Sequence, residues 1–250
     1  VFKKEMRLYF TSPVAWVILT IFLFIAGYFF YSIFAFFTLA SMQSAMNPAM
    51  AGQLNVTESV MRPLFSNVSV ILLFTLPLVT MRTYSEEKRS GTIELLLTSP
   101  LTDVEIILGK FLGAMTLYAA LLAVSISHIG TLFIFGKPEI WPVVTGYLGL
   151  LLMGGCFVSV GLLISSLTKN QIVSGMVTFA VFLFLWVISW LGSFSTGVFT
   201  DVTNYLSIIE HFDDFSKGII DTAHLIYYLS FITFGLFLTA KSVDSERWRG

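Results

Sequence analysis

Six long stretches of the chain lack charged side chains, and shorter polar segments separate them. These charge-free runs cover residues 8–57, 63–81, 111–136, 140–168, 170–200 and 222–240. A helix that crosses about 30 Å of hydrocarbon needs about 20 residues, and a charge at mid-membrane costs about 2.5–3.5 kcal/mol. The pattern therefore predicts six transmembrane helices, at about residues 14–37, 63–81, 106–135, 141–166, 171–190 and 222–240.

The first run is long enough for two helices, but its second half predicts a loop. Residues 38–57 contain several Gln and Asn side chains together with Pro48 and Gly52. In lipid these amide groups would have no hydrogen-bond partners. We therefore expect only one transmembrane helix from this run.

The overall composition agrees with a membrane location. Hydrophobic residues make up 56% of the chain and charged residues 12%, against about 45–50% and about 25% in soluble domains. This excludes a water-soluble enzyme, and a net charge of -1 gives no electrostatic reason to bind nucleic acid. A single cysteine excludes a disulfide framework. The expected fold class is an all-α integral membrane protein.

Basic residues are distributed unevenly between the two ends of the predicted helices. If the N-terminus is cytoplasmic, only Arg62, Lys137 and Lys217 lie outside, which leaves 11 of the 14 Lys and Arg residues inside. Cytoplasmic loops carry such an excess, so we expect both termini in the cytoplasm. The first apolar run is too long for a secretory signal peptide.

Residues 1–11 predict an amphipathic helix that lies along the cytoplasmic membrane surface. Its apolar side contains Phe2, Met6, Tyr9 and Phe10, and its basic side contains Lys3, Lys4 and Arg7. A passive anchor that only supplies inside positive charge is the alternative.

The segment between the second and third predicted helices, residues 82–105, predicts two short helices. Gly91 can end the first of them, and residues 92–97 can form the second. Ser99 and Pro100 then stop the helix. We expect this segment to lie at the cytoplasmic surface.

Two further features of this segment indicate order. Thr102 and Glu105 have the spacing of a capping box that begins the third transmembrane helix. Leu95, Leu96 and Leu97 are costly to expose to water, at about 25 cal/mol per Å² of apolar area. Lipid headgroups or a cytosolic partner protein must therefore cover these leucines.

Residues 191–221 predict an outer amphipathic, re-entrant segment. Its start is too rich in Gly, Ser and Thr to span the membrane, and apolar residues then recur at helical spacing. We expect a hairpin that dips into the outer leaflet, with an apolar face against the membrane or a partner. The candidates for an outer gate are Ile208, Phe212, Phe215 and Ile219. A surface helix without a gating role is the alternative.

Small residues predict close helix packing at two places. Gly109 and Gly113 form one G-x-x-x-G pair at the start of the third helix, and several glycines recur in the fourth. Such residues allow helix backbones to approach each other in membranes.

Signatures of nucleotide binding and hydrolysis are missing from the 250 residues. The sequence contains no G-x-x-x-x-G-K-[ST], no H-E-x-x-H and no G-x-S-x-G. His128 lies inside the third predicted helix, whereas His211 and His224 lie outside it, so we expect no convergence of the three on a metal. No catalytic residue, metal or bound cofactor is predicted.

The stretch LPLVTMRTYSEEKRSGTIELLLTSPLTDVEIILGK, residues 76–110, resembles the signature region of ABC-2 type permeases of ABC transporters. The features in common are an acidic residue at 86 or 87, Gly91-Thr92, Glu94, a leucine run, Pro100 and Gly109-Lys110. The stretches KKEMRLYFTSPVAW and YLSIIEHFDDFSKGIIDT are similar to the branch that includes the gliding-motility permease subunit of Bacteroidetes-like bacteria.

This resemblance implies a non-enzymatic permease subunit of the bacterial inner membrane, in a family made up mostly of exporters. It implies two copies of an ATP-binding subunit, which would hold ATP and Mg, and a second permease half, identical or related. The N-terminal helix and the loop after the second helix would dock that subunit. The residues carried over for docking in that loop are Arg82, Glu86, Glu87, Gly91, Thr92, Glu94, Leu95, Leu96, Leu97 and Pro100. The outer hairpin would help to close the extracytoplasmic end.

Two other functions fit part of the pattern. An anchoring or assembly subunit of an envelope or motility complex would use the same docking loop but transport nothing. A channel would need neither the exposed leucines nor an ATP-binding partner.

Overall fold

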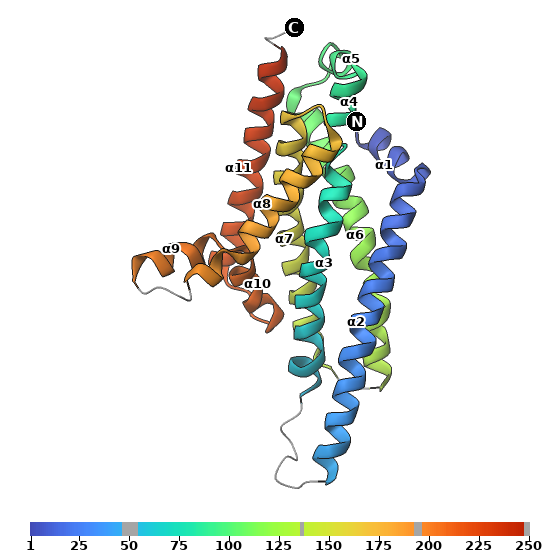
Figure 1. The fold of residues 1–250 in the computed structure, drawn as a ribbon, viewed down its shortest axis with the longest axis vertical. Coiled ribbons are helices and arrows are strands. Elements are labelled where there is room, and N and C mark those ends of the chain that lie inside the picture. Colours follow the sequence, from blue (N-terminus) through green and yellow to red (C-terminus); the bar gives the residue numbers. More distant parts are fainter. Residues whose placement is uncertain (47–54, 136–137, 193–196, 248–250) are drawn as a thin grey trace.

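The computed structural model is a bundle of long helices (Figure 1). It describes residues 1–46, 55–135, 138–192 and 197–247, and these ranges contain no strand. Six of the described helices are long and apolar enough to cross a membrane. The predicted fold class and the predicted number of transmembrane helices are therefore confirmed.

The elements follow the charge-free runs of the sequence closely. In chain order they are α1 (Phe2–Thr11), α2 (Pro13–Met46), the short π-helix η2 (Thr57–Met61), α3 (Arg62–Thr80), α4 (Ser85–Ser90), α5 (Ile93–Leu97), α6 (Asp103–Phe135), α7 (Ile140–Leu167), α8 (Gln171–Gly192), α9 (Val198–Leu206), α10 (Ile208–Ser216) and α11 (Thr222–Arg247). The long helices are α2, α3, α6, α7, α8 and α11.

Helices α3 and α7 form the centre of the bundle, and α2, α8 and α11 expose apolar faces at its periphery. The small residues of α7 make this packing possible. A Cβ atom added at Gly146, Gly154 or Gly161 would collide with Phe65, Tyr118 or Thr80, respectively. The close packing predicted for the fourth transmembrane helix is thus present.

The prediction of a loop from residue 38 onward is wrong for its first part. Helix α2 continues to Met46, and residues 47–54 lie outside the described residues. The stretch 38–46 is rich in Ala, Met and Ser and contains no Pro or Gly, so nothing ends the helix there. At 34 residues α2 is about 51 Å long, which allows the Gln43 amide to lie beyond the hydrocarbon.

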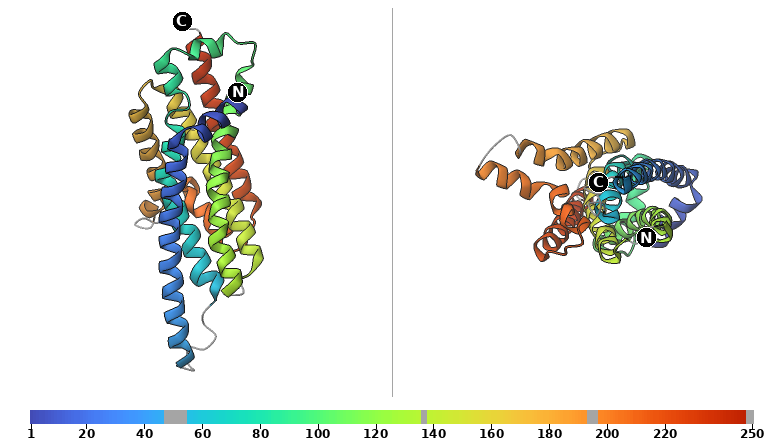
Figure 2. Two further views of the ribbon diagram at one scale, coloured as in Figure 1. Left: turned by 90° about the vertical axis from the view of Figure 1, so that its right-hand side faces the viewer. Right: turned by 90° about the horizontal axis from the view of Figure 1, so that it is seen from below.

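Both chain ends lie at one end of the bundle, together with α4 and α5 (Figure 1). We call this the terminal end. Helix α1 lies across the part of α6 nearest to this end (Figure 2). Farther from the terminal end, α8 leans out of the bundle, and α9 and α10 turn back toward α7 and α11.

Candidate functional site

Three segments meet at the terminal end: the 82–102 loop, the start of α6 that follows it directly, and α1, which lies far away in sequence. The loop is ordered by local signals that the sequence already contains. Helix α4 ends at Gly91, whose φ of 73° is a left-handed conformation that favours glycine. The backbone N–H of Thr102 donates to Glu105 Oε2 at 2.9 Å, and the Glu105 N–H donates to Thr102 Oγ1 at 3.3 Å. The predicted capping box is confirmed.

A buried lysine joins the three segments. Lys110, near the start of α6, is 1% exposed, and its Nζ lies 2.9 Å from Glu5 Oε1 and 2.9 Å from Glu87 Oε2. The same Nζ donates to the Thr83 carbonyl at 2.7 Å and lies 4.8 Å from the centre of the Tyr84 ring. A buried ammonium is costly unless it is paired in this way.

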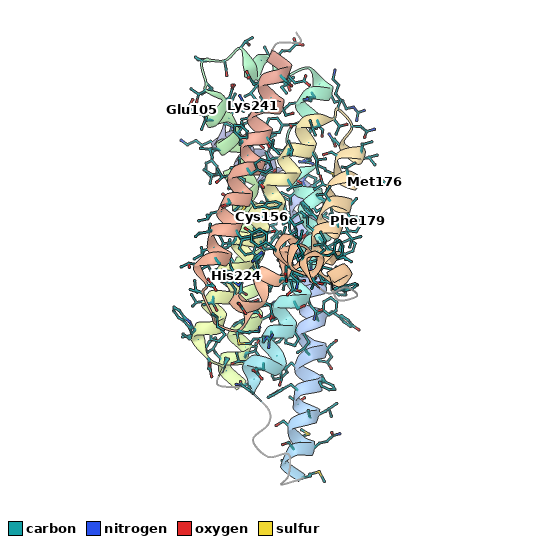
Figure 3. The ribbon with its side chains drawn as sticks, turned by 90° about the vertical axis from the view of Figure 1, so that its left-hand side faces the viewer. Glu105, Cys156, Met176, Phe179, His224 and Lys241 are labelled. Carbon is teal, nitrogen blue, oxygen red and sulfur yellow. The ribbon has the colours of Figure 1, made fainter. Side chains whose placement is uncertain are left out.

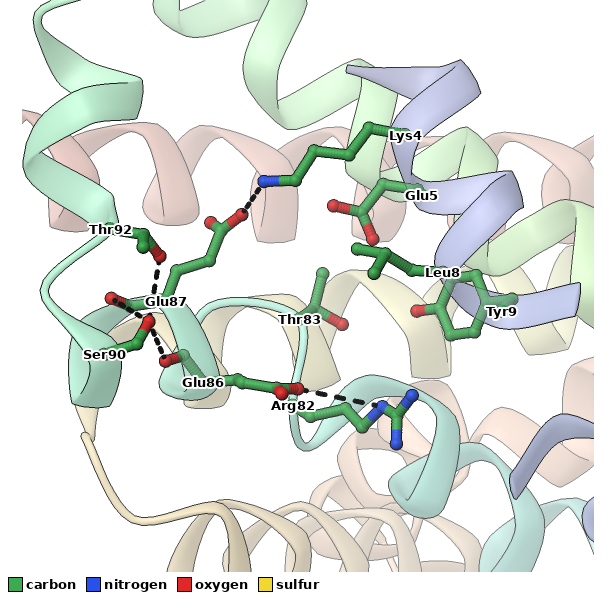
Figure 4. Close-up of a pocket in the computed structure, with 10 residues that line it drawn as sticks. All are labelled: Lys4, Glu5, Leu8, Tyr9, Arg82, Thr83, Glu86, Glu87, Ser90 and Thr92. Carbon is green, nitrogen blue, oxygen red and sulfur yellow. Dashed lines mark hydrogen bonds and ion pairs between the residues drawn. The ribbon is translucent and has the colours of Figure 1, made fainter. Parts of the chain in front are cut away.

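A second lysine extends the cluster to the surface. Lys4 Nζ donates to Glu87 Oε1 at 2.8 Å, although the Lys4 side chain is 54% exposed (Figure 4). This hydrogen bond raises the pKa of Lys4. The charges alternate along Lys4, Glu87, Lys110 and Glu5, so the four groups are together neutral. We call these four residues the charge cluster.

Helix α1 fits against α6 because two glycines leave room for it. A Cβ at Gly109 would lie 2.7 Å from the Val1 Cβ, and one at Gly113 would lie 2.7 Å from the Glu5 Cβ. Glycine at these positions allows the close approach on which the Glu5–Lys110 contact depends.

The buried face of α1 differs from the predicted apolar side. Glu5 and Tyr9 are buried, and the Tyr9 hydroxyl donates to the Val79 carbonyl at 3.2 Å. Phe2, in contrast, is 40% exposed. Met6 and Phe10 are half-buried, whereas Lys3, Lys4 and Arg7 are exposed. Hydrophobic spacing could not identify Glu5, because its partner lies 105 residues away.

The loop is also tied to the last helix. Lys88 Nζ lies 2.7 Å from Glu246 Oε1 of α11, and the Lys88 side chain is only 3% exposed. Arg82 lies 4.0 Å from Glu86 and donates to Ser12 Oγ at 3.3 Å. The loop therefore contacts α1, α6 and α11 through charged groups.

The predicted docking residues divide into an outward and an inward set. We call the outward set the exposed loop face: Glu86, Gly91, Thr92, Glu94, Leu95 and Pro100. Within it Leu95 is 73% exposed. Glu87 points inward as part of the charge cluster, Arg82 is half-buried, and Leu96 is half-buried against the core. The side chain of Leu97 lies outside the described residues.

A pocket of about 300 Å³ lies between α1 and α4 (Figure 4). Its walls carry charges of both signs, from Lys4, Glu5, Arg82, Glu86 and Glu87. No group of three or more potential metal ligands occurs among the described residues. The charged groups that line this pocket form ion pairs with one another and with Lys110.

The candidates for an outer gate mostly face the interior of this chain. Ile208, Phe212 and Phe215 are at most 2% exposed and belong to the core, where Phe215 lies over Gly149 of α7. The expectation that their apolar face contacts the membrane or a partner is wrong, because α7 has a glycine that admits them. Ile219 is 52% exposed.

Two of the three histidines, both outside the third transmembrane helix, lie in contact with each other. His211 of α10 and His224 of α11 lie with their Nδ1 atoms 2.7 Å apart. No local sequence signal indicated this contact, because it depends on how α10 folds back against α11.

No curated protein sequence matches this chain. Residues 1–241 match the family described as ABC-2 family transporter protein, so the match covers α1, the 82–102 loop, five of the six long helices and α11 as far as Lys241. This polytopic membrane chain, with its ordered loop between the second and third long helices, belongs to the ABC-2 family of transporter proteins.

Proposed function

We propose that this chain is the transmembrane half of an exporter that a separate ATP-binding subunit drives by ATP hydrolysis. Membership of the family makes the chain a permease subunit of an ABC transporter. The family implies an ATP-binding partner, and the 250 residues themselves contain no phosphate-binding loop. The proposed complex contains two such subunits and two permease halves.

The proposed orientation places the terminal end in the cytoplasm of a bacterium, with the helices in its inner membrane. The 11 to 3 distribution of basic residues supports this orientation. It puts the charge cluster and the exposed loop face on the side where ATP is available.

The observation that carries the proposal is an exposed leucine on a well-anchored loop. Leu95 is 73% exposed, beside the exposed carboxylate of Glu94. Water is an unfavourable environment for such a side chain, and a partner groove would cover it. The proposed docking surface is the exposed loop face together with the exposed side of α1.

The charge cluster explains how a movement of the partner would reach the transmembrane helices. Glu87 connects the loop to α1 through Lys4 and to α6 through Lys110, and Lys88 connects it to α11. Breaking a buried ion pair costs about 3–5 kcal/mol. A displaced loop would therefore carry these helices with it, as rigid elements that shift between two arrangements.

The test is co-purification of the ATP-binding subunit with variants of the exposed loop face. Leu95→Asp and Glu94→Lys should insert normally but lose the subunit and lose substrate-stimulated ATP hydrolysis. Leu206→Asp and Glu210→Lys are matched controls, because both residues are exposed on the α9–α10 hairpin. The proposal fails if the loop variants keep the subunit and hydrolyse ATP as the wild type does.

Co-purification and ATP hydrolysis of the wild-type complex also distinguish the alternative functions. An anchoring subunit would keep the ATP-binding subunit, but its wild-type complex would show no substrate-stimulated hydrolysis. A channel would purify without an ATP-binding subunit and would conduct without ATP.

A further inference from the structure

A chain of hydrogen bonds crosses between the α9–α10 hairpin and α11. His211 Nε2 lies 2.9 Å from the Tyr205 carbonyl oxygen, and His211 Nδ1 lies 2.7 Å from His224 Nδ1. His224 Nε2 then lies 3.0 Å from Asp214 Oδ2. Figure 3 shows His224 on α11 beside the hairpin. All four ring nitrogens of the two histidines therefore have a partner.

The number of hydrogens that these hydrogen bonds need determines how the two rings are protonated. The Tyr205 carbonyl only accepts, so His211 Nε2 carries a hydrogen. One hydrogen must lie between the two Nδ1 atoms, since two lone pairs or two N–H groups would repel at 2.7 Å. A third hydrogen must lie between His224 and Asp214. Two neutral imidazoles supply only two hydrogens.

We propose that His211, His224 and Asp214 form a binding site for one proton, held in excess of two neutral imidazoles and a carboxylate. While Asp214 remains a carboxylate, the excess proton resides on the imidazole rings and completes all three hydrogen bonds. It titrates as a property of the group and not of one residue. The proposal is independent of the transport function, because it concerns only the occupancy of this site.

The surroundings of the two rings favour this assignment. Burial lowers the pKa of His211, although its bond to Tyr205 opposes this shift. Hydrogen bonds from His224 and Lys217 lower the pKa of Asp214 and keep it a carboxylate. His211 also stacks on Tyr227, with ring centres 3.8 Å apart.

Other charged and titratable groups lie near the site, and three of them, Arg62, Asp213 and Lys217, form ion pairs with one another. Asp213 lies 2.8 Å from Arg62 and 2.5 Å from Lys217. The full set is Tyr205 on α9, Glu210, Asp213 and Lys217 on α10, Asp221, Tyr227 and Tyr228 at the start of α11, Arg62 on α3, Glu58 on η2 and Cys156 on α7. None of them is bonded to the two Nδ1 atoms in the described structure.

The bound proton strengthens the contact between the hairpin and α11 without being its only support. Tyr227 and Tyr228 donate their hydroxyls to the carbonyls of Leu206 and Ile208, at 3.0 and 2.9 Å. These bonds do not change near neutral pH. The hairpin should therefore stay docked at all moderate pH values, most firmly when one excess proton is bound.

The sign of the pH dependence follows from the proton count. At high pH the excess proton leaves and one hydrogen bond is lost. At low pH the unfolded chain protonates His211 near pH 6.5, whereas the folded chain resists because the pKa of His211 is lowered. The folded state then binds fewer protons at this residue and loses stability. Stability should pass through a maximum between these limits.

Nitrogen NMR of the full chain in phosphatidylcholine nanodiscs tests the proton count directly. The chain has only three histidines, so selective ¹⁵N-histidine labelling gives few signals, and His211→Gln and His224→Gln assign them. At pH 7 we expect three protonated nitrogens on the two rings. Two protonated nitrogens would overturn the proposal.

Substitution of the carboxylate gives a second, independent result. Asp214→Asn should remove the excess proton, so that the pair falls from three protonated nitrogens to two at the same pH. Asp213→Asn is the matched control, because Asp213 shares Lys217 but touches neither histidine. Equal loss in both variants would contradict a specific site. The wild-type melting profile against pH is a third measure, and a monotonic profile would also contradict the proposal.

Discussion

The buried lysine of the charge cluster should contribute more to stability than any exposed charge at the terminal end. Lys110→Met would leave Glu5 and Glu87, which are 4% and 8% exposed, without their buried cation. Removing one partner from a buried ion pair costs about 3–5 kcal/mol. For a chain of this size each kcal/mol shifts the melting midpoint by about 2–4 °C, so the expected decrease is roughly 6–20 °C.

Lys4→Met is the matched control, because it removes the same residue type from the same carboxylate. Lys4 is 54% exposed, and exposed ion pairs contribute about 0–1 kcal/mol. Its midpoint should therefore fall by less than about 4 °C. Adding Glu5→Gln to Lys110→Met should restore part of the loss, since one unpaired carboxylate becomes neutral.

The single cysteine provides the assay. Cys156 is fully buried in α7, so a thiol-reactive fluorophore reports unfolding of the bundle at fixed pH. Equal decreases of the midpoint in Lys110→Met and Lys4→Met would refute the larger contribution of the buried lysine. A further decrease on adding Glu5→Gln would refute it as well.

Three further contacts can be tested by substitution, the first two by the same melting assay and the third by hydrogen exchange. Gly113→Ala should cost about 1–3 kcal/mol, because its Cβ would press on α1 at 2.7 Å, whereas Gly130→Ala, with open space around it, should not destabilise. Thr102→Ala removes a capping oxygen and should cost about 1 kcal/mol. Thr145→Val removes a 2.8 Å bond to the α10 backbone and should raise hydrogen exchange in α10 more than in α3.

Much of the fold could be predicted because its signals are local. Charge-free runs identify the six long helices, Gly91 marks the end of α4, and Thr102 with Glu105 marks the start of α6. Each of these features depends on a few neighbouring residues and on the solvent. The extent of α2 differs from the prediction because amide side chains, although unpaired in lipid, are acceptable in a helix that has left the lipid.

The arrangement of the site could be predicted only in part. The loop and α1 were identified, but the pairing of Glu5 with Lys110 joins residues 105 positions apart, and nothing near either residue indicates the other. The inward packing of Phe212 and Phe215 depends on the shape of α7. Docking of an ATP-binding subunit and the assignment to the gliding-motility branch stay predictions.

The long sequence separation within the charge cluster also sets an order of assembly during synthesis. Glu5 cannot meet Lys110 until about 105 more residues have been made, which takes roughly 5–20 s at bacterial and eukaryotic translation rates. The contact between Lys88 and Glu246 must wait longer still, until α11 is complete. The loop is therefore fully anchored only after α11 has been made, and a partner that recognises the anchored loop would select subunits in which α11 is already in place.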